Sequence, residues 1–145
     1  MKDEYMRRLI LCINRIDGKY YDMAKNCFIG ENEVAVLYSL SDGSEHSQKS
    51  ICDEWLIPKT TINSVIHKML KEGYVQITSL AGREKMLALT QDGKDYAKKI
   101  LIPLRKAESY ALDKTLEAFG PSFIDAMEAF TKYLEQYNEV NNDNG

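Results

Sequence analysis

Apolar residues near both ends of the chain recur at alternating spacings of three and four, the pattern of an amphipathic helix with a heptad seam. Over residues 4–27 the repeat consists of Met6, Leu9, Ile13, Ile16, Tyr20, Met23 and Cys27. After residues 120 and 121, Gly-Pro, it consists of Phe123, Met127, Phe130, Leu134 and Tyr137. Such seams bury themselves against a partner helix, and Gly18 permits a bend in the first one.

The part of the chain from residue 31 to residue 73 predicts three shorter helices. The first covers residues 31–40, has an apolar face, and stops at the turn signal Ser-Asp-Gly of residues 41–43. Its inward residues are predicted to be Val34, Leu37, Tyr38 and Leu40. Ser47 can cap a second helix over residues 48–56, with Ile51, Cys52 and Trp55 on one face.

The third of these helices begins at Pro58, whose missing N–H suits the first turn of a helix. Gly73 ends it, as glycine commonly does. Its apolar stripe follows the helical i, i+3, i+4, i+7 pattern and consists of Ile62, Val65, Ile66, Met69 and Leu70.

Two runs of strand character follow, over residues 74–80 and 84–90, with Ala81-Gly82-Arg83 as the turn of a β-hairpin. Residues 91–116 then predict a long helix that is kinked at Pro103. The predicted fold class is mainly α with a small β-hairpin. We expect a single domain over residues 1–145, with helical arms at 1–28 and 91–140, a central unit at 29–90, and a disordered tail at 141–145.

Composition narrows the class of protein. A hydrophobic fraction of 44% supports a packed core, and no apolar run approaches the ~20 residues of a membrane span. The charged N-terminus, MKDEYMRR, lacks the apolar region of a signal peptide, so we expect a cytoplasmic protein with no membrane association. Three widely spaced cysteines fit a reducing compartment. With only His46 and His67 as histidines, no metal site or cofactor is predicted.

Charge is segregated along the chain. Residues 58–85 carry five bases and two acids, which gives +3, whereas residues 107–145 carry eight acids and two lysines, which gives −6. The overall charge of −3 therefore hides a basic central segment, and a phosphate responds to the local field rather than to the average.

The helix that begins at Pro58 leaves a polar face without acids before Glu72. The residues of this face are Lys59, Thr60, Thr61, Asn63, Ser64, His67 and Lys68. Short hydrogen-bonding groups and cations near a helix N-terminus suit entry into the major groove, where Asn63 is placed to read an adenine edge. His67 is a candidate phosphate contact. Arg83 and Lys85 of the hairpin are placed to contact the phosphate backbone or a minor groove. These features predict a winged helix-turn-helix.

At this point the sequence resembles the MarR-like transcriptional regulators. The resemblance is carried by SQKSICDEWLIPKTTINSVIHKMLKEGYV at residues 47–75, by REKMLALTQDGKDY at residues 83–96, and by the order of elements. The second stretch contains the Leu-Thr and the following glycine of that family at Leu89, Thr90 and Gly93. The resemblance implies that residues 58–72 form the recognition helix, that Arg83 enters the minor groove, and that the terminal helices build a two-fold dimer.

Two positions depart from the pattern of that family. The wing commonly has an acid followed by two arginines, where this chain has Ala81, Gly82 and Arg83, so we expect Arg83 to be more mobile and its minor-groove contact to be weaker. The turn between the two DNA-binding helices often contains glycine, where this chain has Leu56. Leucine does not favour the usual turn geometry, and Leu56 is a candidate core residue.

Some residues allow two interpretations. One branch of the resembled family senses peroxides through a cysteine near the positions of Cys12 and Cys27. We favour a packing role for both of these cysteines. Cys52 and Trp55 are predicted to be core residues. Four tyrosines also allow two roles. They line a pocket for a small phenolic or amphipathic effector, or they pack at an interface, which is the favoured interpretation. These residues are Tyr20, Tyr21, Tyr38 and Tyr110.

No nucleophile–base pair, phosphate loop or metal set points to an enzyme. The sequence therefore predicts a homodimeric regulator, acting as a repressor, that binds double-stranded DNA at a pseudo-palindromic operator and is released by a small ligand or another signal. Two alternatives stay open: a winged-helix module that binds protein rather than DNA, and a thiol-based peroxide sensor.

Overall fold

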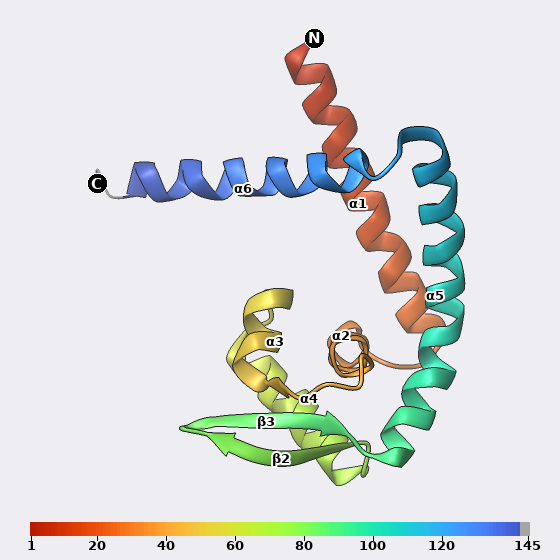
Figure 1. Cartoon of the computed structure of the whole chain (residues 1–145), viewed down its shortest axis with the longest axis vertical. Helices are drawn as coiled ribbons and strands as arrows, with labels where there is room; N and C mark the ends of the chain where they lie inside the picture. The colour runs from red at the N-terminus through yellow and green to blue at the C-terminus, as the bar shows by residue number, and fades with distance from the viewer. Residues whose placement is uncertain (143–145) are drawn as a thin grey trace. The chain divides into compact units, whose positions relative to one another are not determined.

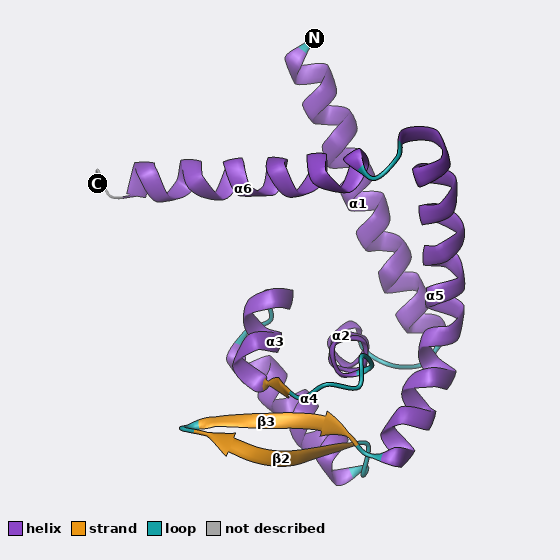
Figure 2. Ribbon diagram, in the orientation of Figure 1, coloured by secondary structure: helices purple, strands orange, loops and turns teal. Residues whose placement is uncertain are grey.

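The computed structural model describes the backbone of residues 1–142 and the side chains of residues 1–137. Over this range the chain has six helices and three strands, in the order shown in Figures 1 and 2. The helices are α1 (Lys2–Asn26), α2 (Glu31–Leu40), α3 (Gln48–Trp55), α4 (Lys59–Lys71), α5 (Gln91–Phe119) and α6 (Ser122–Asn142). The strands are β1 (His46–Ser47), β2 (Val75–Ala81) and β3 (Glu84–Leu89). The predicted fold class, mainly α with a small hairpin, is confirmed.

The chain divides into two compact units between Leu104 and Arg105, one residue after Pro103 and inside α5. The first unit holds α1 to α4, the sheet and the beginning of α5. The second holds the remainder of α5 and α6, joined through Gly120, whose φ of +67° ends the longer helix. The last helix reaches Asn142, two residues into the tail that was expected to be disordered. The rest of that tail, residues 143–145, lies outside the described residues.

The core of the first unit is built from the apolar stripes predicted for α2 and α4, closed by β3 and α5. Its fully buried large side chains include Leu37, Leu40, Ile51, Ile62, Met69, Leu87 and Leu101. Helix α4 buries Ile62, Ile66 and Met69 and half-buries Val65 and Leu70, so the i, i+3, i+4, i+7 reading of this helix is confirmed. The opposite face of α4 is therefore left to solvent.

The three strands form one antiparallel sheet in the order β1-β3-β2. Figure 1 shows the hairpin β2–β3 extending beside α3 and α4; its strands contact these two helices and α2. Gly82, at φ +65°, turns the hairpin. The strand β1 was not predicted, because a two-residue strand exists only through its pairing, here His46 with Leu87 and Ser47 with Met86.

Ser47 caps α3 as predicted, since its hydroxyl accepts a hydrogen bond of 3.0 Å from the Ser50 N–H. Helix α3 ends at Leu56, which adopts the left-handed conformation (φ 51°, ψ 42°) that glycine commonly provides. The Leu56 side chain is 89% exposed, so it is not core. The prediction of Trp55 as core is also wrong: its side chain is 40% exposed and packs edge-to-face on Tyr38.

The Leu-Thr…Gly stretch attaches α5 to the winged helix. Thr90 accepts a hydrogen bond from the Gly93 N–H at 3.0 Å and donates one to the Gly73 carbonyl at 2.5 Å. A Cβ at Gly93 would lie 1.8 Å from the carbonyl oxygen of Tyr74. Glycine is thus required at position 93 for the start of α5 to approach the chain before β2.

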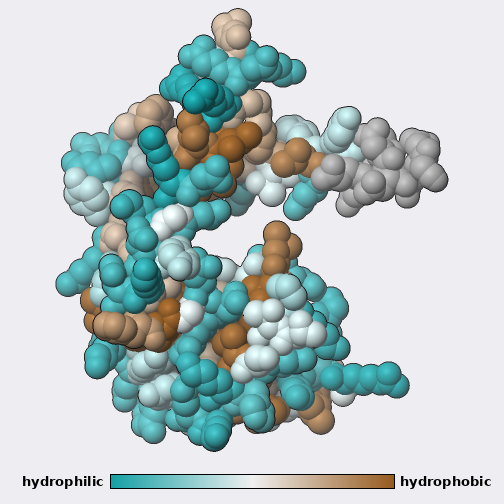
Figure 3. Space-filling view, turned by 180° about the vertical axis from the view of Figure 1, so that it is seen from behind, coloured by the Kyte–Doolittle hydropathy of each residue, from teal (hydrophilic) through white to brown (hydrophobic). Residues whose placement is uncertain are grey.

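Hydrophobic side chains break the hydrophilic surface in several places (Figure 3). On α1 they include Met6, Ile13, Ile16 and Tyr20 of the predicted heptad seam, which are 36 to 53% exposed, and also Tyr5, Ile10, Leu11 and Tyr21 outside it. In the second unit they include Phe119, Leu134 and Tyr137. None of the described helices is long and apolar enough to cross a membrane.

Candidate nucleic-acid interface

The polar face of α4 is exposed, as its sequence pattern predicted. Thr61 is half-buried, and the exposed members of the predicted reading face are Lys59, Thr60, Asn63, Ser64, His67 and Lys68. Pro58 precedes the first residue of α4, and no described side chain caps the N–H groups of its first turn. These N–H groups form the positive end of the helix dipole, where anionic groups are favoured.

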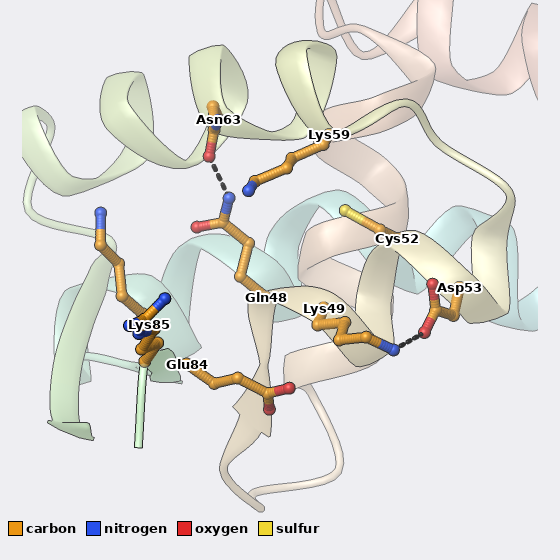
Figure 4. Close-up of a pocket in the computed structure, with 9 residues that line it drawn as sticks. Gln48, Lys49, Cys52, Asp53, Lys59, Asn63, Glu84 and Lys85 are labelled. Carbon is orange, nitrogen blue, oxygen red and sulfur yellow. Dashed lines mark hydrogen bonds and ion pairs between the residues drawn. The ribbon is translucent and has the colours of Figure 1, made fainter. Parts of the chain in front are cut away.

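A pocket of about 640 Å³ lies between α3, the N-terminal half of α4 and the hairpin. It is lined by Gln48, Lys49, Cys52, Asp53, Lys59, Asn63, Arg83, Glu84 and Lys85. In Figure 4, Lys59 and Asn63 come from α4, Gln48 and Lys49 from α3, and Lys85 from the hairpin. Four of the predicted DNA-binding residues, Lys59, Asn63, Arg83 and Lys85, are thereby brought to one concave surface.

The charges of this pocket are four cations and two carboxylates. Lys49 is engaged with Asp53, Nζ to Oδ2 at 2.7 Å, and this hydrogen bond raises the pKa of the Lys49 ammonium. Lys59, Arg83 and Lys85 form no ion pair with any described residue. Three cations in the pocket therefore keep their charge available to an external anion such as a phosphate.

Lys68 departs from the predicted reading face. Its ammonium lies 2.9 Å from Glu33 Oε2 and 3.9 Å from Glu72 Oε1, and the hydrogen bond to Glu33 raises the pKa of Lys68. Glu33 is a buried carboxylate of α2 that also accepts a hydrogen bond of 3.4 Å from the Tyr96 hydroxyl of α5. Lys68 thus joins α4 to α2, unlike the other cations of the predicted reading face.

Two residues of this region escaped the sequence analysis. Nothing in the sequence around Glu33 marked it as a functional residue. Its ion pair with Lys68 depends on a tertiary contact between residues that are 35 positions apart in the sequence. Gln48 donates a hydrogen bond from Nε2 to Asn63 Oδ1, from the start of α3 to α4. The capping signal at Ser47 placed Gln48 at the first position of α3, but no local pattern pointed to Asn63 as its partner.

The four tyrosines considered for an effector pocket differ in their surroundings. A second cavity, about 220 Å³, is lined by Tyr20 together with Met23, Ala24, Asn26, Cys27, Val34, Ile100, Leu101, Pro103 and Leu104. Tyr38 packs against Trp55, Tyr21 is exposed on α1, and Tyr110 is exposed in the second unit. Only Tyr20 among these four lines the cavity.

The cysteines occupy three different environments. Cys12 is exposed on α1, so the prediction of an embedded packing residue is wrong for the single chain. Cys27 is half-buried, with its sulfur 4.0 Å from the Ile100 carbonyl oxygen. Cys52 is half-buried against the core, and burial raises the pKa of its thiol, which opposes formation of a reactive thiolate. Among the described residues no group of three or more His, Cys, Asp or Glu is arranged to hold a metal ion.

Comparison with known proteins first gives a match to the central part of the chain. Residues 29–93 match the family described as winged helix DNA-binding domain, a span that contains α2, α3, α4, the hairpin and the start of α5. None of the curated proteins matches the chain.

Solved structures then give the particular fold. NMB1585, a MarR family regulator from Neisseria meningitidis, is 24% identical with a TM-score of 0.74, and the match covers 94% of this chain and 98% of that one. The MarR family transcriptional regulator SPO1453 from Silicibacter pomeroyi DSS-3 is 16% identical, with a TM-score of 0.72 and coverage of 89% and 93%. NadR, solved in complex with 4-hydroxyphenylacetate, is 14% identical, with a TM-score of 0.67 and coverage of 87% and 88%. Residues 29–93 match a winged helix domain and the chain has the fold of MarR family regulators, so the resemblance is confirmed at the level of the fold.

Proposed function

We propose that this protein is a cytoplasmic, homodimeric, sequence-specific DNA-binding regulator that represses transcription from a pseudo-palindromic operator. The observation that carries the proposal is the pocket between α3, α4 and the hairpin. There Lys59, Arg83 and Lys85 surround Asn63 and have no ion-pair partner among the described residues. Cations supply affinity for phosphates, and an amide supplies base recognition, so the set has both components of specific DNA binding.

In the proposed complex the N-terminal half of α4 enters the major groove. Asn63 and Thr60 face base edges, while Lys59 lies beside the phosphates. Arg83 occupies the two-residue turn of the hairpin, next to Gly82, and reaches the adjacent backbone or minor groove. Lys68 is left out of this interface because Glu33 holds it.

The proposed second protomer is supported by the exposed apolar seam of α1. Apolar surface that is exposed to water costs about 25 cal/mol per Å² of free energy. A second copy of the chain that packs on the seam removes this cost. The two-fold symmetry of such a dimer predicts half-sites roughly one helical turn, ~10 bp, apart. Sedimentation at micromolar concentration tests the dimer directly.

We also propose that the 220 Å³ cavity beside Tyr20 accepts a small phenolic or amphipathic effector. Its volume is below the ~300–1,000 Å³ of drug-sized sites, which limits the effector to about one aromatic ring. Apart from Asn26 and the Tyr20 hydroxyl, the residues that line it are apolar or cysteine. Loss of operator binding on addition of a monocyclic phenol, absent in a Cys27→Leu variant that narrows the cavity, tests this assignment.

Selection of bound sequences from a random duplex pool tests the main proposal, because a palindromic motif reports specificity and two-fold symmetry together. Arg83→Ala is expected to weaken binding to all sequences and to reduce the slope of log affinity against log salt by about one. Asn63→Ala is expected to blur the base preference at one position as well. Lys94→Ala, an exposed lysine of α5 outside the pocket, is the matched control. Absence of duplex binding at low salt would instead favour a winged-helix module that binds protein.

A further inference from the structure

Gln48 and Asn63 form a pair of neutral amides within a pocket whose other polar side chains are charged. Gln48 is the first residue of α3 and Asn63 lies in the second turn of α4. The two are joined by the hydrogen bond from Gln48 Nε2 to Asn63 Oδ1, and both line the pocket beside Lys59 (Figure 4). Charged side chains attract any phosphate, whereas base edges are distinguished by their pattern of donors and acceptors. The amide pair is therefore the part of this pocket suited to reading sequence.

The hydrogen bond determines what the pair can offer to DNA. A primary amide has a carbonyl oxygen with two lone pairs and an amino group with two N–H donors, so the bond between the two side chains uses one N–H of Gln48 and one lone pair of Asn63. The groups that take no part in it are the Asn63 amino group, a donor, and the Gln48 carbonyl oxygen, an acceptor. The pair thus presents a free donor group and a free acceptor from two adjacent helices.

This combination matches one base in the major groove. Adenine exposes the N7 acceptor and the N6 amino donor, which complement the Asn63 amino group and the Gln48 oxygen respectively. Guanine exposes two acceptors, N7 and O6, and would leave the Gln48 oxygen without a donor. An unsatisfied polar group in a desolvated interface is costly, so guanine is rejected at this position.

The bond also fixes the reading groups before DNA arrives. Both side chains have several rotatable bonds, and ordering them on binding would reduce affinity. A residue of α3 that orients the amide of α4 removes part of this cost. It also ties base reading to the spacing of the two helices, which Ile51 and Ile62 hold from within the core.

We propose that Gln48 is a second specificity-determining residue, which together with Asn63 reads the adenine of one A·T pair in each half-site. The assignment rests on the proposed DNA-binding function and deepens it. It adds a residue of α3 to the reading set that the α4 pattern predicts, and it states the base.

The test is selection from a random duplex pool with four proteins: the parent, Gln48→Met, Asn63→Ala and the double variant. Methionine keeps the length and volume of Gln48 and removes its polar groups. We expect the parent to enrich A·T over G·C at one position of each half-site by roughly tenfold. Each single variant is expected to lose that preference at the same position, with no further loss in the double variant, because the two residues act as one unit.

Lys59→Ala is the matched control, since Lys59 lines the same pocket and carries charge rather than an amide. It is expected to weaken binding to every sequence and to leave the enriched base unchanged. Retention of the A·T preference by Gln48→Met, its loss at a different position, or a parent preference for G·C at the Asn63 position would overturn the assignment. A parent that enriches no motif would refute the proposed function itself, and the assignment with it.

Discussion

Glu33, Lys68 and Tyr96 form a polar cluster around a buried carboxylate, and its acid and its lysine should respond unequally to mutation. The Glu33 side chain is 6% exposed and the Lys68 side chain is 56% exposed. Replacing Lys68 by Met removes the cation 2.9 Å from a carboxylate that cannot reach water. Replacing Glu33 by Gln frees a cation that can turn toward solvent and still has Glu72 at 3.9 Å. The loss of the lysine is therefore expected to cost more than the loss of the acid.

The magnitudes follow from this exposure. Leaving a buried charge without its partner costs about 3–5 kcal/mol, and the remaining hydrogen bond from the Tyr96 hydroxyl to Glu33 places Lys68→Met near the lower end, about 3 kcal/mol. Glu33→Gln removes the ion pair and one of the two acceptor oxygens, and the lysine is largely solvated, so about 1 kcal/mol is expected.

The assay is urea unfolding at one fixed protein concentration, with the transition midpoint compared at unchanged slope. Lys71→Met is the matched control, because Lys71 is an exposed lysine of the same helix that forms no ion pair with a described residue. It should change the free energy of unfolding by less than about 0.5 kcal/mol. A Glu33→Gln variant as unstable as Lys68→Met, or more so, would refute the reasoning from burial.

Three further variants test the fold by the same assay. Gly93→Ala should lower the free energy of unfolding by about 3 kcal/mol, since its Cβ would lie 1.8 Å from a backbone oxygen of Tyr74, and an unchanged midpoint would contradict this close approach. Leu56→Gly should raise the free energy of unfolding by up to about 1 kcal/mol, because leucine is strained in the left-handed conformation and its side chain is 89% exposed. A lower free energy of unfolding would show that the leucine side chain is buried in solution. The pKa of Tyr96 is raised from 10.0 to about 12, mainly because the side chain is partly buried. The contribution of the Tyr96 hydroxyl to stability is therefore full below pH 10 and is lost as the pH rises toward 12. Tyr96→Phe should flatten that alkaline loss between pH 10 and pH 12, and parallel curves for the two proteins would contradict it.

Periodicity predicted most of the fold, because the positions that repeat at helical spacing are the positions that pack. Helix α2 has the predicted bounds, Glu31–Leu40, and α4 buries its predicted stripe. Burial at the edge of an element was harder to predict. Trp55 lies on the apolar face of α3 by spacing, yet the helix ends beside it and leaves it 40% exposed against Tyr38.

The charged residues of the site could be predicted from the sequence, but the ion pairs that they form could not. The sequence identified Lys59, Asn63, Arg83 and Lys85, which the structure brings to one pocket, because clustered cations and a polar helix face are local features. Which cation is already neutralised depends on residues far away in the chain. Lys68 has the same local signal as Lys59, and only the tertiary contact with Glu33 separates their roles.

The contacts that hold α5 to the winged helix also hold the reading helix. Glu33 accepts hydrogen bonds from Tyr96 of α5 and from Lys68 of α4, so one buried carboxylate joins both helices to α2. Asn63 lies five residues before Lys68, about one and a half turns along the same rigid helix. A displacement of α5 that breaks the hydrogen bond from the Tyr96 hydroxyl to Glu33 would leave the carboxylate with Lys68 as its remaining strong partner. It would therefore change the interaction that joins α4 to α2. In the proposed complex a shift of α5 would therefore act on α4, and on Asn63 within the pocket, through this one side chain.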